Sequence, residues 1–174
     1  MHSLNIYNET VYFRDIKLQD LPLVLKWYNK VDDFKFATGI DTPLTLEMLT
    51  KKYAEVAICS NEFFVGIHDA AEQQMIGILK GRLEPKNKFS VWISSIAIDS
   101  MHQNKGLGTA AVNLLLEFLK TSHNIQYVYL AVIEENEQGR SFWIKLGFNE
   151  LRKIENHLML QNKPQNVILM HKQL

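Results

Sequence analysis

The sequence predicts an α/β protein in which a central sheet lies between two layers of helices. Short runs rich in β-branched and aromatic residues alternate along the chain with amphipathic segments. The clearest pair is the apolar run at residues 91–98, which suits a buried strand, and the amphipathic segment that begins at Gly106. Other helical segments are expected before and after this pair, so helices should cover both faces of the sheet.

The N-terminal elements expected in order are a strand, a helix, an irregular segment and a short helix, at residues 11–17, 18–30, 31–45 and 46–53. In the first helix Pro22 fits only the first turn, where its missing N–H is not needed. The irregular segment contains two Asp residues, Gly39 and Pro43. Thr45 is a suitable N-cap for the short helix that follows.

The remaining strands are expected at residues 62–68, 75–82, 91–98, 126–132, 148–155 and 166–172. Turns or links that join these strands to the next element are expected at residues 69–74, 84–88, 134–138 and 161–165. The first two strands form a hairpin, and Gly77 in the second indicates a bulge or a close approach of another backbone. Gly147 is well placed to end a short helix before the final pair of strands.

The composition fits one domain over residues 1–174, with 47% hydrophobic residues to build a core. Lys plus Arg and Asp plus Glu both number 19, so charge gives no reason to expect nucleic acid or an anionic membrane as a partner. A single cysteine, Cys59, excludes an intramolecular disulfide and a cysteine-based zinc site, and we expect no metal. Because neither a signal peptide nor a membrane-length apolar run is found, we expect a cytoplasmic protein.

The loop between the central strand and its helix is a candidate anion site. The first N–H groups of a helix have no partner within it, and the helix dipole adds partial positive charge there. Glycine allows a phosphate to approach the backbone closely, and a lysine adds a cation. We therefore interpret the loop as a phosphate or pyrophosphate cradle formed by Gln103, Asn104, Lys105, Gly106, Leu107, Gly108 and Thr109. A plain glycine-rich turn before a core helix is the competing interpretation.

Two other phosphate-binding motifs fit this loop less well. A dinucleotide fingerprint would need a third glycine where Ala111 stands, so a nicotinamide-dinucleotide enzyme is a distant alternative. The G-x-x-x-x-G-K-[ST] motif of nucleoside-triphosphate P-loops does not occur in the sequence.

Two blocks of the sequence carry a family resemblance. Residues 103–108 read Gln-Asn-Lys-Gly-Leu-Gly and follow an Ile-Ala-Ile-Asp run, and residues 136–148 contain an Asn, an aromatic pair and a final Gly-Phe. These blocks resemble the Gln/Arg-x-x-Gly-x-Gly/Ala signature and the fourth-helix pattern of the GNAT superfamily of acetyl-CoA-dependent N-acetyltransferases. The resemblance covers roughly residues 90–148. It implies a mixed, mostly antiparallel sheet whose two central strands splay apart to admit acetyl-CoA.

The resemblance also implies a function and the residues that serve it. Backbone groups of Ile96, Ala97 and Ile98 would bind the pantetheine arm and polarise the thioester carbonyl. The cradle loop would hold the pyrophosphate, and Asn136 would contact the cofactor arm. The reaction would move an acetyl group to a primary amine of a polyamine, an aminoglycoside, an amino-acid derivative or a protein N-terminus. Pairing of the C-terminal strands in relatives further implies that a homodimer can form.

The sequence departs from the family at its catalytic positions. Many relatives have a tyrosine acid where Trp143 stands, and an indole N–H can only donate a hydrogen bond. Some branches carry a Glu base where we align Ala131, and others an Asp where we align Ser94. The acid and both bases of these branches are therefore missing.

Three hypotheses follow for the chemistry. Glu134 or Glu135 supplies the base, although a solvated loop is the commoner role for such carboxylates. Alternatively, a water chain along Ser94 or Ser95 relays the proton; two serines in an apolar strand also suit a bulge. The third hypothesis is an acyl-CoA-binding regulatory domain with little or no turnover.

The segment before Thr45 is a candidate wall for the acceptor, because this region covers the acceptor cleft in relatives. Its aromatic candidates are Trp27, Tyr28, Phe34 and Phe36. Its acidic residues, which could attract a cationic amine, are Asp32, Asp33 and Asp41. Core packing and a solvated acidic loop are the competing interpretations for these two groups.

Overall fold

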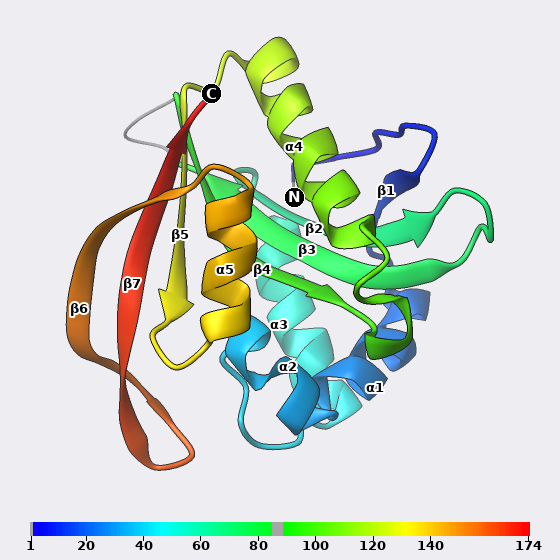
Figure 1. Ribbon diagram of the computed structural model, residues 1–174. Coiled ribbons are helices and arrows are strands. Elements are labelled where there is room, and N and C mark those ends of the chain that lie inside the picture. The colour runs from blue at the N-terminus through cyan, green and yellow to red at the C-terminus, as the bar shows by residue number, and fades with distance from the viewer. Residues whose placement is uncertain (1, 85–88) are drawn as a thin grey trace.

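The computed structural model describes residues 2–84 and 89–174, and a seven-stranded sheet organises them (Figure 1). The strands are β1 (Val11–Asp15), β2 (Glu62–Asp69), β3 (Met75–Leu83), β4 (Ser90–Ile98), β5 (Tyr127–Ile133), β6 (Asn149–Leu160) and β7 (Lys163–Gln173). Their order across the sheet is β1-β2-β3-β4-β5-β7-β6. Among these described strands, β4 and β5 are parallel and the other neighbours are antiparallel. The expectation of a mixed, mostly antiparallel sheet is confirmed.

Helices cover both faces of this sheet (Figure 1). They are α1 (Leu21–Tyr28), α2 (Val31–Thr38), α3 (Leu46–Ile58), α4 (Leu107–His123) and α5 (Glu137–Lys145), with short 3-10 turns at Leu18–Asp20 and Ser100–His102. Apolar residues of α4 and α5 pack on one face and form the α4-side core. Those of α1, α2 and α3 pack on the opposite face and form the α1-side core. None of the helices in the described part of the chain is long and apolar enough to span a bilayer.

The prediction of an irregular segment at residues 31–45 is wrong for its first half, which forms α2. Phe34 of this helix is only 1% exposed in the α1-side core, and Ser95 donates a hydrogen bond to the Ala37 carbonyl at 2.7 Å. Gly39, with φ of 68°, ends the helix. Because a short helix has little stability of its own, contacts with distant residues stabilise α2, and the local sequence does not reveal them.

The C-terminal strands and α3 also differ from the expected lengths. Thr45 accepts a hydrogen bond from the Met48 N–H as expected of an N-cap, but α3 then continues to Ile58. The link expected at residues 161–165 is shorter, because only Gln161 and Asn162, both with positive φ, separate β6 from β7. Residues 85–88, part of another expected turn, lie outside the described residues.

Gly77 marks a close approach, as predicted. A Cβ atom at this position would lie 2.4 Å from the Ala97 carbonyl oxygen of the neighbouring strand β4. Any side chain here would therefore force β3 and β4 apart next to the end of the central strand.

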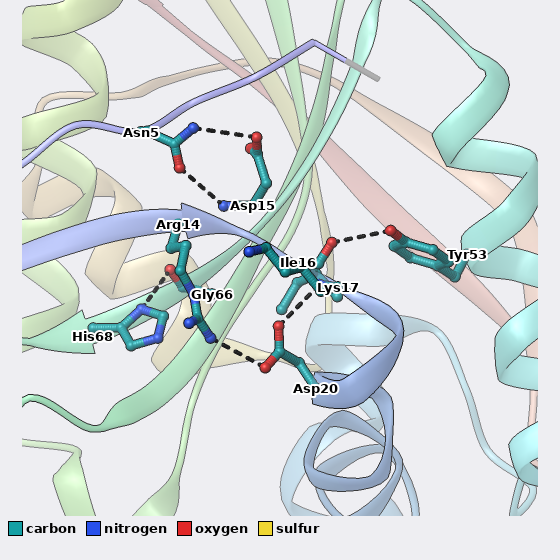
Figure 2. A network of polar contacts seen from close by, with 9 residues as sticks. All are labelled: Asn5, Arg14, Asp15, Ile16, Lys17, Asp20, Tyr53, Gly66 and His68. Atoms are coloured by element: carbon teal, nitrogen blue, oxygen red, sulfur yellow. Dashed lines mark hydrogen bonds and ion pairs between the residues drawn. The ribbon is translucent and has the colours of Figure 1, made fainter.

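Polar contacts join β1 to the helices that follow it (Figure 2). The Asp20 carboxylate accepts hydrogen bonds from the Arg14 guanidinium at 3.1 Å and from the Lys17 N–H at 2.9 Å. The Tyr53 hydroxyl of α3 donates to the Ile16 carbonyl at 3.1 Å. These bonds satisfy backbone groups where the chain leaves the sheet, and they hold α1 and α3 against its edge.

His68 lies beside this network in β2 and is 4% exposed (Figure 2). Its ring stacks on Tyr12 with centroids 4.6 Å apart, and its Nδ1 lies 3.1 Å from the Gly66 carbonyl oxygen. Burial lowers the pKa of His68 from its ordinary value, because the imidazolium loses hydration inside the protein.

The free energy of unfolding should therefore fall as the pH drops from about 7 to about 5. In this window His68 binds a proton more readily in the unfolded chain than in the folded protein, where its pKa is lower. Replacing His68 with Gln should reduce this pH dependence. Denaturant unfolding at both pH values tests this, and an unchanged pH dependence in His68→Gln would contradict it.

Candidate functional site

The parallel strands β4 and β5 separate part-way along their length. Their pairing runs from Ser90 opposite Tyr127 to Trp92 opposite Tyr129. Beyond this point β4 stays paired with β3, and β5 stays paired with β7. Figure 1 shows the two strands diverging toward their carboxyl ends. The structure thus has the splayed central strands that the family resemblance implied.

A pocket of about 640 Å³ lies at this opening, and we call it the first pocket. Both splayed strands, the cradle loop and one face of α5 line it. Lys145 is the charged residue in its described lining, which contains no carboxylate. Most residues proposed from the sequence line this pocket, namely Ser94, Ile96, Ile98, Gln103, Asn104, Gly106, Gly108, Thr109, Asn136 and Trp143.

Ser94 lies at an irregularity in β4. Lys80 of β3 pairs with Ser95 and Gly81 pairs with Ile93, so Ser94 is the extra residue of a bulge. Its side chain is exposed in the first pocket. The neighbouring hydroxyl of Ser95 is instead bonded to α2, so of the two serines Ser94 is better placed to contact a ligand.

The other proposed backbone contacts of β4 differ in direction. Ala97 is buried in the α1-side core, and its carbonyl approaches Gly77 of β3 rather than the opening. The carbonyl of Ile98 accepts a hydrogen bond from the Gln103 side chain at 2.8 Å, on the side of the cradle loop. Backbone groups of Ile96 and Ile98 are therefore better placed than those of Ala97 to meet a ligand in the first pocket.

The cradle loop turns sharply into α4. Asn104 and Gly106 have φ values of 60° and 80°, and Gly106 is the residue that precedes the first helical turn. This first turn contains no acidic residue, so the partial positive charge at the start of α4 is not offset within the helix. Leu107 is buried in the α4-side core and fixes the start of the helix, whereas Lys105 is exposed outside the pocket lining.

The start of α5 is different because a side chain already caps it. The Asn136 side-chain oxygen accepts a hydrogen bond from the Gly139 N–H at 2.9 Å. A Cβ atom on Gly139 would meet the Asn136 amide group, so a larger residue would displace the Asn136 side chain from its capping position. The α4 start is therefore the better anion site of the two helix ends that border the pocket.

Glu134 does not line the first pocket. Its carboxylate lies 2.8 Å from the Lys153 ammonium and accepts a hydrogen bond from the Asn166 side chain at 2.9 Å. These contacts with Lys153 and Asn166 lower the pKa of Glu134, because they stabilise its charged form. Both its position and its weak basicity argue against a role as the general base.

Trp143 lines the first pocket but is mainly a core residue. It is 6% exposed, and its ring packs edge-on against Phe142 and Phe148 with centroids 5.1 Å and 5.0 Å away. Little of the side chain is therefore open to a ligand, and its indole N–H supplies no proton.

A second pocket of about 570 Å³ adjoins the first. The two share lining residues, which are Phe36, Ala37, Gln103, Asn136 and Gln138. The second pocket has the opposite charge, because Asp32, Glu135 and Glu137 line it and its described lining contains no lysine or arginine. The two pockets thus differ in the charge of the ligand that each one favours.

Some residues of the candidate acceptor wall lie in the core, and others line this second pocket. Trp27, Tyr28 and Phe34 are buried in the α1-side core, whereas Phe36 lines both pockets. Asp41 accepts a hydrogen bond from the Gln161 N–H at 2.5 Å and so holds the turn between β6 and β7. The side chain of Asp33 is not among those that the structure describes.

Sequence analysis missed the α5 residues of the first pocket, which are Gln138, Ser141, Phe142 and Lys145. Their spacing places them on one face of a helix, so a helical pattern starting from Asn136 could have found them. It also missed Glu137, whose contribution becomes visible only when α2 is placed opposite α5.

Comparison with known proteins gives the family. A family model described as an acetyltransferase (GNAT) domain matches residues 13–169. The chain belongs to the GNAT acetyltransferase family. The family-level expectation drawn from residues 90–148 is thereby confirmed over most of the chain.

GNAT proteins of known activity match parts of this chain. The spermidine N(1)-acetyltransferase of Escherichia coli (strain K12) is 32% identical over 75 residues, which are 43% of this chain and 40% of that protein. The L-2,4-diaminobutyric acid acetyltransferase of Oceanobacillus iheyensis is 23% identical over 101 residues, or 57% of this chain and 55% of that protein. The matches thus span about half the length of these relatives or less.

Solved GNAT structures resemble the whole fold. A spermidine N-acetyltransferase from Vibrio cholerae, solved in complex with CoA and spermine, has a TM-score of 0.83 at 21% identity and covers 95% of this chain and 96% of its own. A ribosomal-protein-S5-alanine acetyltransferase from Vibrio fischeri has a TM-score of 0.76 at 19% identity, with 98% and 96% coverage. At these identities the likeness concerns the fold alone.

Proposed function

We propose that this GNAT protein transfers an acetyl group from acetyl-CoA to a primary amine of a small molecule that carries a second cationic group. The observation that carries the proposal is the pair of adjoining pockets with different charge. An anionic cofactor suits the pocket that lies between splayed strands and ends at the uncapped start of α4. A cationic acceptor suits the pocket lined by carboxylates.

The proposed cofactor position follows from the polar groups of the first pocket. Amides at the start of α4, from Gly106 to Thr109, would bind the pyrophosphate. The pantetheine arm would lie between β4 and β5, where Ile96 and Ile98 are not paired with β5. Asn136 would contact the arm through the side-chain nitrogen that remains after its oxygen caps α5.

The proposed reaction forms a C–N bond and breaks the C–S bond of the thioester. The attacking amine must be neutral, so it has to lose a proton before or during attack. Because no carboxylate lines the described part of the first pocket, we propose that water beside Ser94 carries this proton toward the second pocket. In the second pocket Glu135, rather than Glu134, would accept this proton. The thiolate leaves and takes a proton from water.

A second cationic group in the acceptor follows from the same charges. Carboxylates near the reacting amine would favour its protonated form and slow attack. An acceptor with two amines avoids this conflict, because one ammonium remains in the acidic pocket while the other, neutral amine enters the first pocket. The two relatives described above are named for spermidine and for L-2,4-diaminobutyric acid, and both compounds carry more than one amine.

A binding protein without turnover is the second candidate, and the absence of a carboxylate from the described lining of the first pocket favours it.

The cytoplasmic location and the homodimer expected from the sequence stay predictions.

Thermal unfolding with acetyl-CoA, CoA and NAD, followed by a free-thiol assay with amines, tests the proposal. A ligand at one hundred times its dissociation constant should add about 2.7 kcal/mol of stability. We expect a rise in melting temperature with both CoA compounds and not with NAD, and thiol release that depends on a diamine. Stabilisation without thiol release would favour the binding protein, and no stabilisation by CoA would contradict both.

A further inference from the structure

Asp99 connects the α1 side of the sheet to the cradle loop. It directly follows β4 and precedes the turn Ser100–His102. Its carboxylate accepts a hydrogen bond from the Trp27 indole N–H of α1 at 2.7 Å and from the Met101 N–H at 3.3 Å. The Lys30 ammonium lies 3.6 Å from the same carboxylate.

The backbone of Asp99 is held as well. Its N–H donates to the Ile76 carbonyl of β3 at 2.8 Å, and its carbonyl accepts from the His102 N–H at 2.8 Å. Partial burial opposes the charge of Asp99, but the hydrogen bonds from Trp27 and Met101, together with the charges of Lys30 and His102, hold the pKa of this carboxyl below its usual range. Asp99 is therefore a charged acceptor between a helix, a strand and the turn that leads into the cradle loop.

Trp27 provides a rigid hydrogen-bond donor for Asp99. The side chain is 2% exposed in the α1-side core, so its indole N–H has a fixed position. A hydrogen bond from a buried donor to a carboxylate is stronger than one between neutral groups. Neither Trp27 nor Asp99 lines either pocket, so any effect on a ligand must pass through the loop.

We propose that Asp99 is a positioning residue for the cofactor: by bonding Trp27 and the Met101 N–H together, it orients the cradle loop so that the amides at the start of α4 point at the CoA pyrophosphate. This inference rests on the proposed function, because it assumes that CoA occupies the first pocket. It extends the binding site to two residues that make no contact with the cofactor.

The test is a double-mutant cycle with Trp27→Phe and Asp99→Asn, read out as the dissociation constant for CoA. Phenylalanine keeps an aromatic ring in the core but removes the donor, and asparagine keeps the shape but removes the charge. We expect each variant to weaken CoA binding about tenfold, with the double variant no worse than about either single one, since Trp27→Phe removes the bond and Asp99→Asn removes the charge that strengthens the same bond.

Two controls separate positioning from general destabilisation. Lys30→Met removes the more distant ammonium but keeps the Trp27 bond, and should change CoA affinity by less than about twofold. Val56→Ala truncates another buried residue of the same core, away from the loop. It should lower the melting temperature as Trp27→Phe does while leaving CoA affinity unchanged. In steady-state assays, Asp99→Asn should raise KM for acetyl-CoA and leave kcat and the acceptor KM unchanged.

The outcomes are distinguishable. Wild-type CoA affinity in both Trp27→Phe and Asp99→Asn would overturn the positioning role and leave the proposed function standing. Equal losses in Val56→Ala and Trp27→Phe would also overturn it, because the effect would then be general. Absence of CoA binding by the wild-type protein would overturn the proposed function and this inference together.

Discussion

Gly106→Asp should abolish CoA binding while the protein stays folded. Gly106 has φ of 80°, a backbone conformation that aspartate tolerates better than most residues. Apart from its neighbours in the chain, no residue comes within 4 Å of a Cβ atom at this position, so the new side chain has room. It would place a carboxylate at the start of α4, where the pyrophosphate is proposed to bind. Because like charges brought together cost several kcal/mol, we expect the CoA dissociation constant to rise by about 100-fold or more.

Gly106→Asn is the matched control, because it has the same size and the same tolerance of positive φ but no charge. Its CoA affinity should fall by less than about tenfold. Isothermal titration with CoA measures both variants, and circular dichroism checks their folding. Wild-type affinity in Gly106→Asp would refute the cradle. Equal loss in both variants would show that the glycine backbone, rather than charge, is what binding requires.

Neutralising the second pocket should selectively weaken the use of diamines. In the double variant Asp32→Asn and Glu137→Gln, which keeps the proposed proton acceptor Glu135, we expect KM for a diamine to rise about tenfold, since each exposed charge contributes up to about 1 kcal/mol. The KM for acetyl-CoA should not change, because its pocket lacks these residues. The effect should shrink at high salt, since exposed charges are screened.

Glu155→Gln provides the comparison, because it removes an exposed carboxylate of β6 that lines neither pocket. A monoamine of similar length serves as the second comparison and should lose little in the double variant. If diamine and monoamine kinetics changed equally, the second pocket would not recognise a distal cationic group. If neither changed, the acceptor would enter by another route.

The elements around the cradle could be predicted from the sequence because their signals are local. The strand that ends at Ile98, the turn at Gly106 and the helix that follows are each specified by residues within a few positions of one another. Eight proposed site residues of this stretch line the first pocket, and Asn136 and Trp143 of the second family block also line it. Gly77 was likewise identified as a special position from its type and place in a strand alone.

The sequence was less informative about which of several adjacent residues in a strand or loop faces the pockets. The direction of the Ala97 carbonyl depends on the bulge at Ser94, which shifts the register of β4 against β3. The choice between Glu134 and Glu135 depends on Lys153 and Asn166 of the last two strands, which hold Glu134 away from the pockets. The paired serines do indicate a bulge, but neither the direction of the Ala97 carbonyl nor the contacts of Glu134 can be predicted from adjacent residues.

The fold class and the strand, turn and helix around Gly106 could be predicted from the sequence alone, since they depend on residue types at short spacing. The lack of the family's usual acid and bases follows from the family resemblance. Three features depend on tertiary packing: residues 31–38 form a helix, Asp32 joins Glu135 and Glu137 in one pocket, and Asp99 accepts a hydrogen bond from Trp27. These features bring together segments far apart in the chain, and packing of both helix layers against the sheet sets their distances. Local periodicity reports which face of an element is buried, but not which distant side chain it meets.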